Sequence, residues 1–155
     1  MPSVFLRPAT EHDIAFLADV SIVATRSAGR LPAEFDEPAW REGFGEWTHE
    51  QVQGLVEHST TYVVEIDGES AGRLRVVRAP DHLELAGLQL LPAHQGQGIG
   101  THLVEQLLVE ARDTGLQMRL SVDVDNPRAR ALYSRLGFVA TGETDAEVHM
   151  EWRGA

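Results

Sequence analysis

The first third of the chain carries apolar residues at the three- and four-residue spacing of one helix face. After a short strand candidate at 4–7, this spacing predicts a helix from about residue 10 to 25. Residues 26–37 contain Gly and Pro with few periodic apolar positions, so we expect a loop there. A second helical stretch is predicted at 38–58, and a second start signal at Thr48 predicts that it is broken into a pair of helices.

The pattern then changes to the two-residue alternation that is typical of strands. Two apolar runs, 61–66 and 70–77, are separated by Asp67-Gly68, a dipeptide that favours a tight hairpin turn. A third run at 83–91 follows another turn signal. These runs predict an antiparallel meander in the middle of the chain.

A glycine-rich segment joins the third run to a helix. Glycines stand at positions 96, 98 and 100, and apolar residues then recur on one helical face until Gly115. Such a turn directs several backbone N–H groups to one point, where the helix dipole also favours negative charge, so it suits a phosphate group. The spacing differs from the dinucleotide fingerprint, and the lysine of a Walker loop is missing.

A strand candidate at 116–124 leads into a short helix with complete boundary signals. Asn126 can cap its first turn, Pro127 suits a first helical position, and Gly137 suits a left-handed exit. Residues 149–152 predict a last strand. Strands and helices therefore alternate in the second half of the chain.

Two motifs in this half resemble those of a known family. Gln95-x-x-Gly98-x-Gly100 after a strand, followed by Asn126-x-x-Ala129-x-x-x-Tyr133-x-x-x-Gly137-Phe138, is similar to the two acyl-coenzyme A motifs of the GNAT superfamily of N-acetyltransferases. The similarity covers residues 83–139, about a third of the chain. The amino-terminal half contains no comparable motif.

The resemblance implies a mixed α/β fold with a central, mostly antiparallel and splayed β-sheet. About six to seven strands and about four to five helices, on both faces of the sheet, are expected. The 155 residues fit a single N-acetyltransferase domain spanning 1–155. Within it, residues 83–139 carry the acetyl-coenzyme A motifs, and the helices of residues 10–60 form the acceptor side.

The resemblance also implies where acetyl-coenzyme A binds. Its pyrophosphate is expected on the amides of the glycine-rich turn, and its pantetheine arm at the edge of the preceding strand, as an added pseudo-strand. The residues assigned to it are Leu88, Leu90, Gln95, Gly96, Gln97, Gly98, Ile99, Gly100, Thr101 and Asn126.

The strand before the turn changes the parity of its leucines. Leu83 and Leu85 fall on one face, whereas Leu88 and Leu90 fall on the other, which predicts a bulge near Gly87. A strand buried on both faces would show the same leucines without a bulge.

Glu84 and Tyr133 are the catalytic candidates. A primary amine with a pKa near 10.4 is mostly protonated at neutral pH, so its attack on a thioester is helped by a base. Glu84 lies eleven residues before Gln95, where several members of the family carry a catalytic glutamate. Tyr133 lies where the family keeps a phenol near the sulfur. The alternatives are an exposed strand carboxylate and a tyrosine that only packs its short helix.

Composition narrows the range of partners. With 24 acidic and 13 basic residues, the net charge of -11 disfavours nucleic acid and anionic lipid and favours a cationic amine as acceptor. All 13 basic residues are arginine and no cysteine is present, which excludes lysine Schiff-base and cysteine-nucleophile mechanisms. No signal-peptide pattern or membrane-span run occurs, so we expect a cytoplasmic protein, as a monomer or a homodimer.

Other residues are weaker candidates. The seven histidines are scattered without ligand spacing, so no metal is expected. Trp40, Phe44 and Trp47 fall at helical spacing, which favours core packing. Alternatively, they line the acceptor pocket together with acidic residues of 34–37, an arrangement that suits a cationic amine.

Two other functions compete with acetyl transfer. One is a sensor or regulatory module that binds coenzyme A without chemistry, and the presence of both Glu84 and Tyr133 disfavours it. The other is an ATP-binding module, which the missing lysine disfavours. Polyamines, aminoglycosides, amino acids and protein amino termini all remain open as acceptors.

Overall fold

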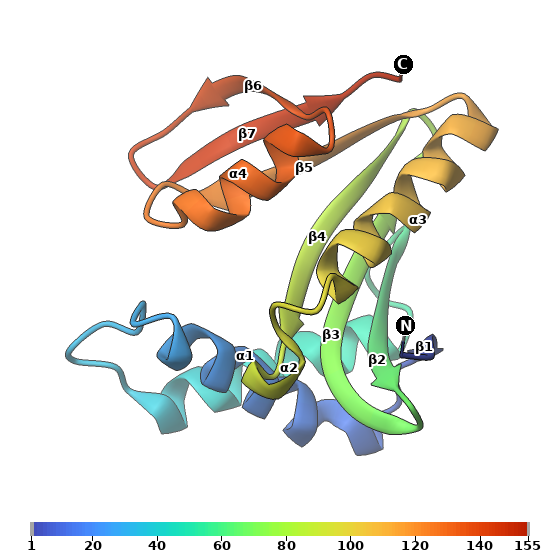
Figure 1. Cartoon of the computed structure of the whole chain (residues 1–155). Helices are drawn as coiled ribbons and strands as arrows, with labels where there is room; N and C mark the ends of the chain where they lie inside the picture. The colour runs from blue at the N-terminus through green and yellow to red at the C-terminus, as the bar shows by residue number, and fades with distance from the viewer. Residues whose placement is uncertain (1, 155) are drawn as a thin grey trace. The chain divides into compact units, whose positions relative to one another are not determined.

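The computed structural model describes residues 2–154, which form a seven-stranded sheet and four α-helices (Figure 1). In chain order the elements are β1 (Val4–Pro8), η1 (Glu11–Asp13), α1 (Ile14–Ser27), α2 (Glu37–Val52), β2 (Ser59–Ile66), β3 (Glu69–Arg78), β4 (His82–Leu90), η2 (Pro92–His94), α3 (Ile99–Thr114), β5 (Gln117–Asp123), α4 (Pro127–Arg135), β6 (Val139–Glu143) and β7 (Glu147–Trp152). The strand order is β1-β2-β3-β4-β5-β7-β6, with β4 and β5 parallel. The predicted mixed α/β fold with a mostly antiparallel sheet is confirmed.

The chain divides into two compact units, and each draws on two segments. The first holds the residues up to Arg75 together with Gly87–Gln97, and the second holds Val76–Ala86 and the residues from Gly98 onward. β3 and β4 therefore contribute residues to both units. Each unit is described separately below.

In the first unit, α1 and α2 pack on each other, and β1 pairs antiparallel with β2. Its core is built from side chains that are completely buried: Leu17, Val20, Val63, Val64 and Leu74. The predicted Thr10–Asp13 capping box is present at η1. Asp13 also accepts two hydrogen bonds from the Arg7 guanidinium, at 2.9 and 3.0 Å, and so joins η1 to β1.

One sequence prediction for this unit is wrong. α2 runs without a break from Glu37 to Val52, whereas a break was expected at Thr48 and helix was expected up to residue 58. Thr48 is only 1% exposed, so its side chain lies in the interior of the unit and does not cap a new helix. Gly54, with φ +75°, lies directly beyond the end of the helix.

The hairpin predicted between β2 and β3 is confirmed. Asp67 and Gly68 have φ of +51° and +84°, the pair of left-handed residues that a two-residue hairpin of type I′ requires. On β4, burial changes from Leu83 and Leu85 to Leu90, as the leucine parity predicts. The bulge near Gly87 stays a prediction.

In the second unit, α3 buries one face against its surroundings. The buried residues, at helical spacing, are Ile99, Leu103, Val104, Leu107, Leu108 and Ala111. β5 alternates buried and more exposed positions and pairs with β7. α4 lies alongside these strands (Figure 1). β6 was not predicted, because all five of its residues are exposed and it carries no apolar alternation.

Candidate active site

The glycine-rich segment forms a tight turn between η2 and α3. Gly96 and Gly98 have φ of +73° and +79°, a region that residues with a Cβ rarely adopt. Apart from chain neighbours, no described atom lies within 4 Å of the place that a Cβ would take at either glycine. Gly98 is the N-cap of α3 and brings no side chain to cover it. The backbone at the start of α3 is therefore accessible to a ligand.

The amides of this helix start suit an anion. The first N–H groups of an α-helix have no carbonyl within their own helix, so Ile99, Gly100 and Thr101 can donate to an outside acceptor. Ile99 is 1% exposed, and its buried side chain fixes the first turn. The positive end of the helix dipole lies at the same place. These residues fit the pyrophosphate of coenzyme A.

The two glutamines of the turn fold back onto the backbone. The Gln95 Nε2 group donates to the Leu90 carbonyl at 2.9 Å, and the Gln97 Nε2 group donates to the Ala93 carbonyl at 3.1 Å. Their amide groups thus brace the turn. The carbonyl of Leu90, on the strand expected to bind pantetheine, is already engaged by Gln95.

Glu84 lies on β4 directly opposite Arg119 of β5. The pairing of these parallel strands covers His82–Leu85 and goes no further along β4. A cavity of about 280 Å³ opens in this part of the second unit, and its lining residues are His82, Glu84, Arg119, Leu120, Ser121, Thr141, His149, Met150 and Glu151. Glu84 is therefore a half-buried cavity residue, and not an isolated surface carboxylate.

The same cavity contains polar pairs that the sequence analysis did not identify. Ser121 Oγ and His149 Nδ1 lie 2.8 Å apart, and Arg119 Nε lies 3.4 Å from a carboxylate oxygen of Glu151. The sequence carries a signal for these polar residues, because they occupy every second position of β5 and β7, on the face of each strand that is not buried. The pairing of β5 with β7, which brings Ser121 opposite His149, depends on tertiary structure.

Tyr133 lies on α4 with its ring packed edge-on against Phe138, at a centroid distance of 5.8 Å. Burial raises the pKa of the Tyr133 phenol above its usual value of 10.0, so the hydroxyl keeps its proton at neutral pH. Tyr133 is not among the described residues that line the Glu84 cavity.

Asn126 caps α4 as predicted. Its Oδ1 accepts a hydrogen bond from the Ala129 N–H at 3.2 Å, and Gly137 leaves the helix with φ +99°. The side-chain NH₂ of Asn126 remains available as a donor.

The aromatic residues of the first unit form a continuous row. Successive ring centroids from Phe35 through Trp40 and Phe44 to Trp47 are 6.1, 4.8 and 6.2 Å apart. All four rings are half-buried, so core packing, the favoured expectation, is wrong for this row.

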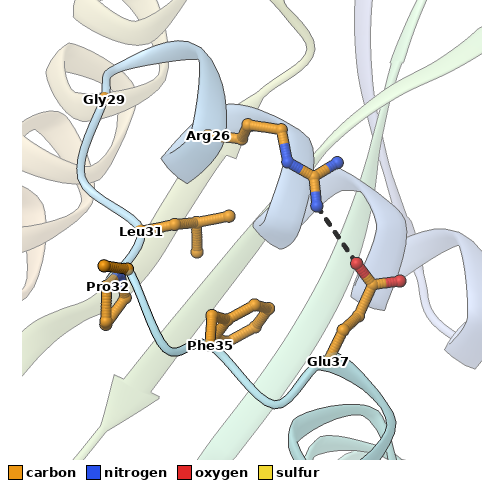
Figure 2. A pocket seen from close by; sticks show the side chains of 7 residues that line it. Arg26, Gly29, Leu31, Pro32, Phe35 and Glu37 are labelled. Atoms are coloured by element: carbon orange, nitrogen blue, oxygen red, sulfur yellow. Dashed lines mark hydrogen bonds and ion pairs between the residues drawn. The ribbon is translucent and has the colours of Figure 1, made fainter.

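A second cavity, of about 390 Å³, lies at the Phe35 end of this row (Figure 2). Its carboxylate, Glu37, bonds to Arg26 at 3.1 Å and to Arg41 at 3.0 Å. Hydrogen bonds from Arg41 and Arg26 hold the pKa of Glu37 below its usual value. Of the three acidic residues expected to attract a cationic amine, Glu34, Asp36 and Glu37, at least Glu37 is thus already paired with arginines.

At the other end of the row, Arg73 and Arg75 of β3 contact the rings. The Arg73 guanidinium lies 5.5 Å from the Phe44 centroid and 5.6 Å from that of Trp47, and Arg75 lies 4.7 Å from Trp47. Arg73 is only 5% exposed. Burial, with a smaller contribution from the charge of Arg75, lowers the pKa of Arg73 to about 10. The spacing of two arginines within a buried strand was a signal that the sequence analysis did not use.

Among residues 2–154, no group of three or more His, Asp or Glu side chains is placed to hold a metal ion. None of the helices in that part of the chain has the length and apolar character needed to cross a bilayer.

The known proteins to which this chain is similar are acetyltransferases. Residues 24–138 match the profile described as the Acetyltransferase (GNAT) family. The chain is 30% identical over 147 residues to a spermidine N(1)-acetyltransferase of Escherichia coli strain K12, covering 91% of this chain and 75% of the relative.

Solved structures show the same fold. The PaiA N-acetyltransferase from Thermoplasma acidophilum, in complex with coenzyme A, superposes with a TM-score of 0.81 at 19% identity over 98% of this chain and 99% of that one. An aminoglycoside acetyltransferase, AAC(6')-Ib, in complex with coenzyme A and kanamycin gives a TM-score of 0.73 at 22% identity, over 97% and 95% of the two chains.

Three observations indicate the same family: the turn at Gly98, the order of the elements, and the family match over residues 24–138. The chain belongs to the GNAT family and is an acyltransferase whose acetyl donor is acetyl-coenzyme A.

Proposed function

We propose that this enzyme acetylates a primary amine, of a small molecule or of a protein, by direct attack on acetyl-coenzyme A in a ternary complex. The observation that carries the proposal is the left-handed Gly98 at the start of α3, which leaves the first-turn amides uncovered. The pyrophosphate binds along Gln95–Thr101, and the pantetheine arm binds along Leu88 and Leu90. Asn126 contributes its free side-chain NH₂.

In this mechanism Glu84 is the base, and Tyr133 assists the departing sulfur. The bound thioester supplies an activated acetyl carbon, with a thiolate as leaving group. Glu84 takes a proton from the acceptor ammonium, directly or through water, so that the nitrogen can form the new C–N bond. An N–H near Leu90 stabilises the negative charge on the carbonyl oxygen. As the C–S bond breaks, the Tyr133 hydroxyl donates a hydrogen bond to the departing sulfur, and the second proton that the nitrogen loses as the amide forms passes to that sulfur, which leaves as the thiol.

The two units work together as a single transferase domain, because the family match at residues 24–138 includes segments of both. We place the enzyme in the cytoplasm, where acetyl-coenzyme A is made and used, as a monomer or homodimer. The net charge of -11 disfavours nucleic acid as a partner. The relatives named above act on spermidine and on aminoglycosides, which are both amines, and this supports an amine acceptor here.

Release of free thiol from acetyl-coenzyme A tests the proposal. The purified enzyme is incubated with polyamines, aminoglycosides, amino acids and a peptide with a free amino terminus, and thiol is titrated against an amine-free control. Release that depends on any one of these amines supports acetyl transfer. Stabilisation by coenzyme A without any release indicates the sensor module instead.

A further inference from the structure

The arginine cluster of the first unit consists of Arg73 and Arg75 of β3, and no carboxylate among residues 2–154 is bonded to the Arg73 guanidinium. In residues 2–154, the only hydrogen bond of the Arg73 guanidinium is from Nη1 to the neutral Oε1 of Gln89, at 3.0 Å. Arg75 adds a second cation on the same strand and donates to Ser59 Oγ at 3.1 Å. Burying a charge away from water is costly unless an opposite charge or several hydrogen bonds compensate it. The positive charge of this cluster is therefore suited to binding an anion.

The unused donors point to the same conclusion. Arg73 Nε is buried and has no hydrogen-bond partner, and the same holds for Gln51 Nε2. Each of these atoms can donate a hydrogen bond. Gln51 is connected to the arginines, because its Oε1 accepts from Ser59 Oγ at 2.5 Å and Ser59 in turn accepts from Arg75. Buried donors in native proteins are nearly always satisfied, so these two atoms are suited to bind an acceptor group.

The cluster also reaches β4, next to the residues proposed to bind the thioester arm. A Cβ at Gly87 would collide with Arg73 Nη1, so the guanidinium rests directly on the β4 backbone at this glycine. Gly87 immediately precedes Leu88. An anion on Arg73 would therefore lie beside the strand along which we propose that the acetyl group is presented.

We propose that Arg73, supported by Arg75, binds a carboxylate of the acceptor, so that the preferred substrate is an amine that also carries a carboxylate, such as an amino acid. This inference rests on the proposed function. The Nε side of a guanidinium matches the two oxygens of a carboxylate, and on Arg73 that side has no partner. The inference replaces the cationic acceptor that overall composition favours.

Access to Arg73 requires movement of the aromatic row. Arg73 is 5% exposed, and the rings of Phe44 and Trp47 cover its guanidinium. Both rings belong to half-buried residues of α2, so they can shift without opening the core of the unit. Binding of a carboxylate should therefore change the fluorescence of Trp47.

The test compares matched acceptors that differ only in the carboxylate: phenylalanine with phenethylamine, and ornithine with putrescine. Charge-assisted hydrogen bonds predict that kcat/KM is higher for the carboxylate member by about 10- to 100-fold. In Arg73→Met this preference should disappear through a higher KM for the amino acid, while the values for the simple amines stay near wild type. Arg78→Met is the matched control, because Arg78 ends the same strand and pairs with Glu110.

Stability separates binding from structure. Removing an uncompensated buried cation should leave the melting temperature of Arg73→Met unchanged or higher. A melting temperature that falls, together with equal losses for both members of a pair, would show that the arginine only supports the fold. If Arg73→Met does not fold, Arg73→Lys is used, because it keeps the charge but loses the paired N–H donors of the guanidinium. A reduced preference for the carboxylate substrates in Arg73→Lys supports the proposal. An unaltered preference overturns it.

A binding measurement distinguishes failure of this inference from failure of the proposed function. Tryptophan fluorescence is titrated with phenylalanine, with phenethylamine and with sodium chloride at equal ionic strength. A change with phenylalanine alone, lost in Arg73→Met, supports the carboxylate site even if no thiol is released. A wild-type preference for phenethylamine, or the same fluorescence change with chloride, overturns the inference while amine-dependent thiol release still supports acetyl transfer.

Discussion

Tyr133 is a residue whose chemistry is set by its surroundings. Burial raises the pKa of its phenol above 10.0, so the hydroxyl is fully protonated at neutral pH and is able to donate. A coenzyme A thiolate, with a pKa near 8.5 by analogy with cysteine, is a weaker base than the Tyr133 phenolate. Complete proton transfer from the phenol to the sulfur is therefore uphill. Tyr133 should help by hydrogen-bonding the departing sulfur and should not be indispensable.

Tyr133→Phe is accordingly expected to lower turnover by about 10- to 100-fold, at or below the lower limit of the range of about 100- to 10,000-fold for a single general acid. The ring and its contact with Phe138 are kept, so the melting temperature should change little. Turnover is measured at saturating acetyl-coenzyme A beside a thermal melt, with Tyr62→Phe, at the other tyrosine, as the control. Unchanged turnover in Tyr133→Phe would remove the phenol from the mechanism.

Glu84→Gln should lower turnover by about 100-fold or more at neutral pH, because the amide cannot take a proton from the acceptor. Raising the pH should restore part of the loss, since more of the amine is then neutral. The measurement is a pH profile of kcat for this variant and for Glu151→Gln. Glu151 lines the same cavity but is paired with Arg119 and Arg153, so its profile should keep the wild-type shape. If the rate of Glu84→Gln matches wild type at every pH, Glu84 is not the base.

Residues that act through local backbone geometry were predictable, whereas residues that act through tertiary contacts were not. The turn at Gly98 and the helix cap at Asn126 were predicted correctly, because turn conformation and helix capping depend on a few neighbouring positions in the sequence. The pairing of Ser121 with His149 joins two strands 28 positions apart in the chain. Arg73 owes its properties to aromatic rings on α2 that no local pattern assigns to it.

At the scale of elements, α3 offers a controlled experiment because left-handed glycines flank both of its ends. Gly98 and Gly115 have φ of +79° and +70°, and both have open space where a Cβ would be. Replacing either with Glu imposes similar backbone strain. The helix dipole then makes the unliganded Gly98→Glu protein the more stable variant, because negative charge is favourable at the N-terminus and unfavourable at the C-terminus.

The response to acetyl-coenzyme A should be the reverse. Gly98→Glu puts a carboxylate where we propose that the pyrophosphate binds, so the rise in melting temperature with the ligand should vanish. Gly115→Glu should keep the wild-type rise, which at 100 times the dissociation constant corresponds to about 2.7 kcal/mol. Thermal melts of both variants, with and without ligand, check this. An equal response in the two variants would contradict phosphate binding at this turn.

Elements with strong periodicity were predicted best. The buried face of α3 and the Asp67-Gly68 hairpin agree with the structure, because each combines an apolar period with a defined boundary residue. β6 was missed, since a fully exposed edge strand buries no face that could impose an alternation. The false break at Thr48 arose because a polar side chain inside a helix resembles a cap when its burial is unknown.

The molecule as a whole carries an excess of 11 negative charges, so its stability should depend on pH in the acid range, where the carboxylates take up protons. Among residues 2–154, three carboxyl groups have a pKa held below the usual value, at Asp13, Glu37 and Asp81. Glu37 and Asp81 are on the surface, where solvent weakens ion pairs. Asp13 has a side chain only 14% exposed, and hydrogen bonds from Arg7 are the largest cause of its lowered pKa.

A carboxyl group whose folded-state pKa lies below the unfolded value of 3.8 stabilises the protein above that pH, and the stabilisation is lost as the pH falls through the folded-state pKa. Asp13→Asn should therefore lower the free energy of unfolding at pH 7 by about 1–2 kcal/mol, in the range for hydrogen bonds to charged groups. As the pH falls below 3.8 and through the lower folded-state pKa, the difference between variant and wild type should shrink, because Asp13 then becomes protonated in the wild type as well. Urea unfolding of both proteins from pH 7 to pH 3 measures the difference, with Asp81→Asn as a control that should stay near wild type. A difference that persists undiminished at pH 3 would show that the Arg7 ion pair is not its source.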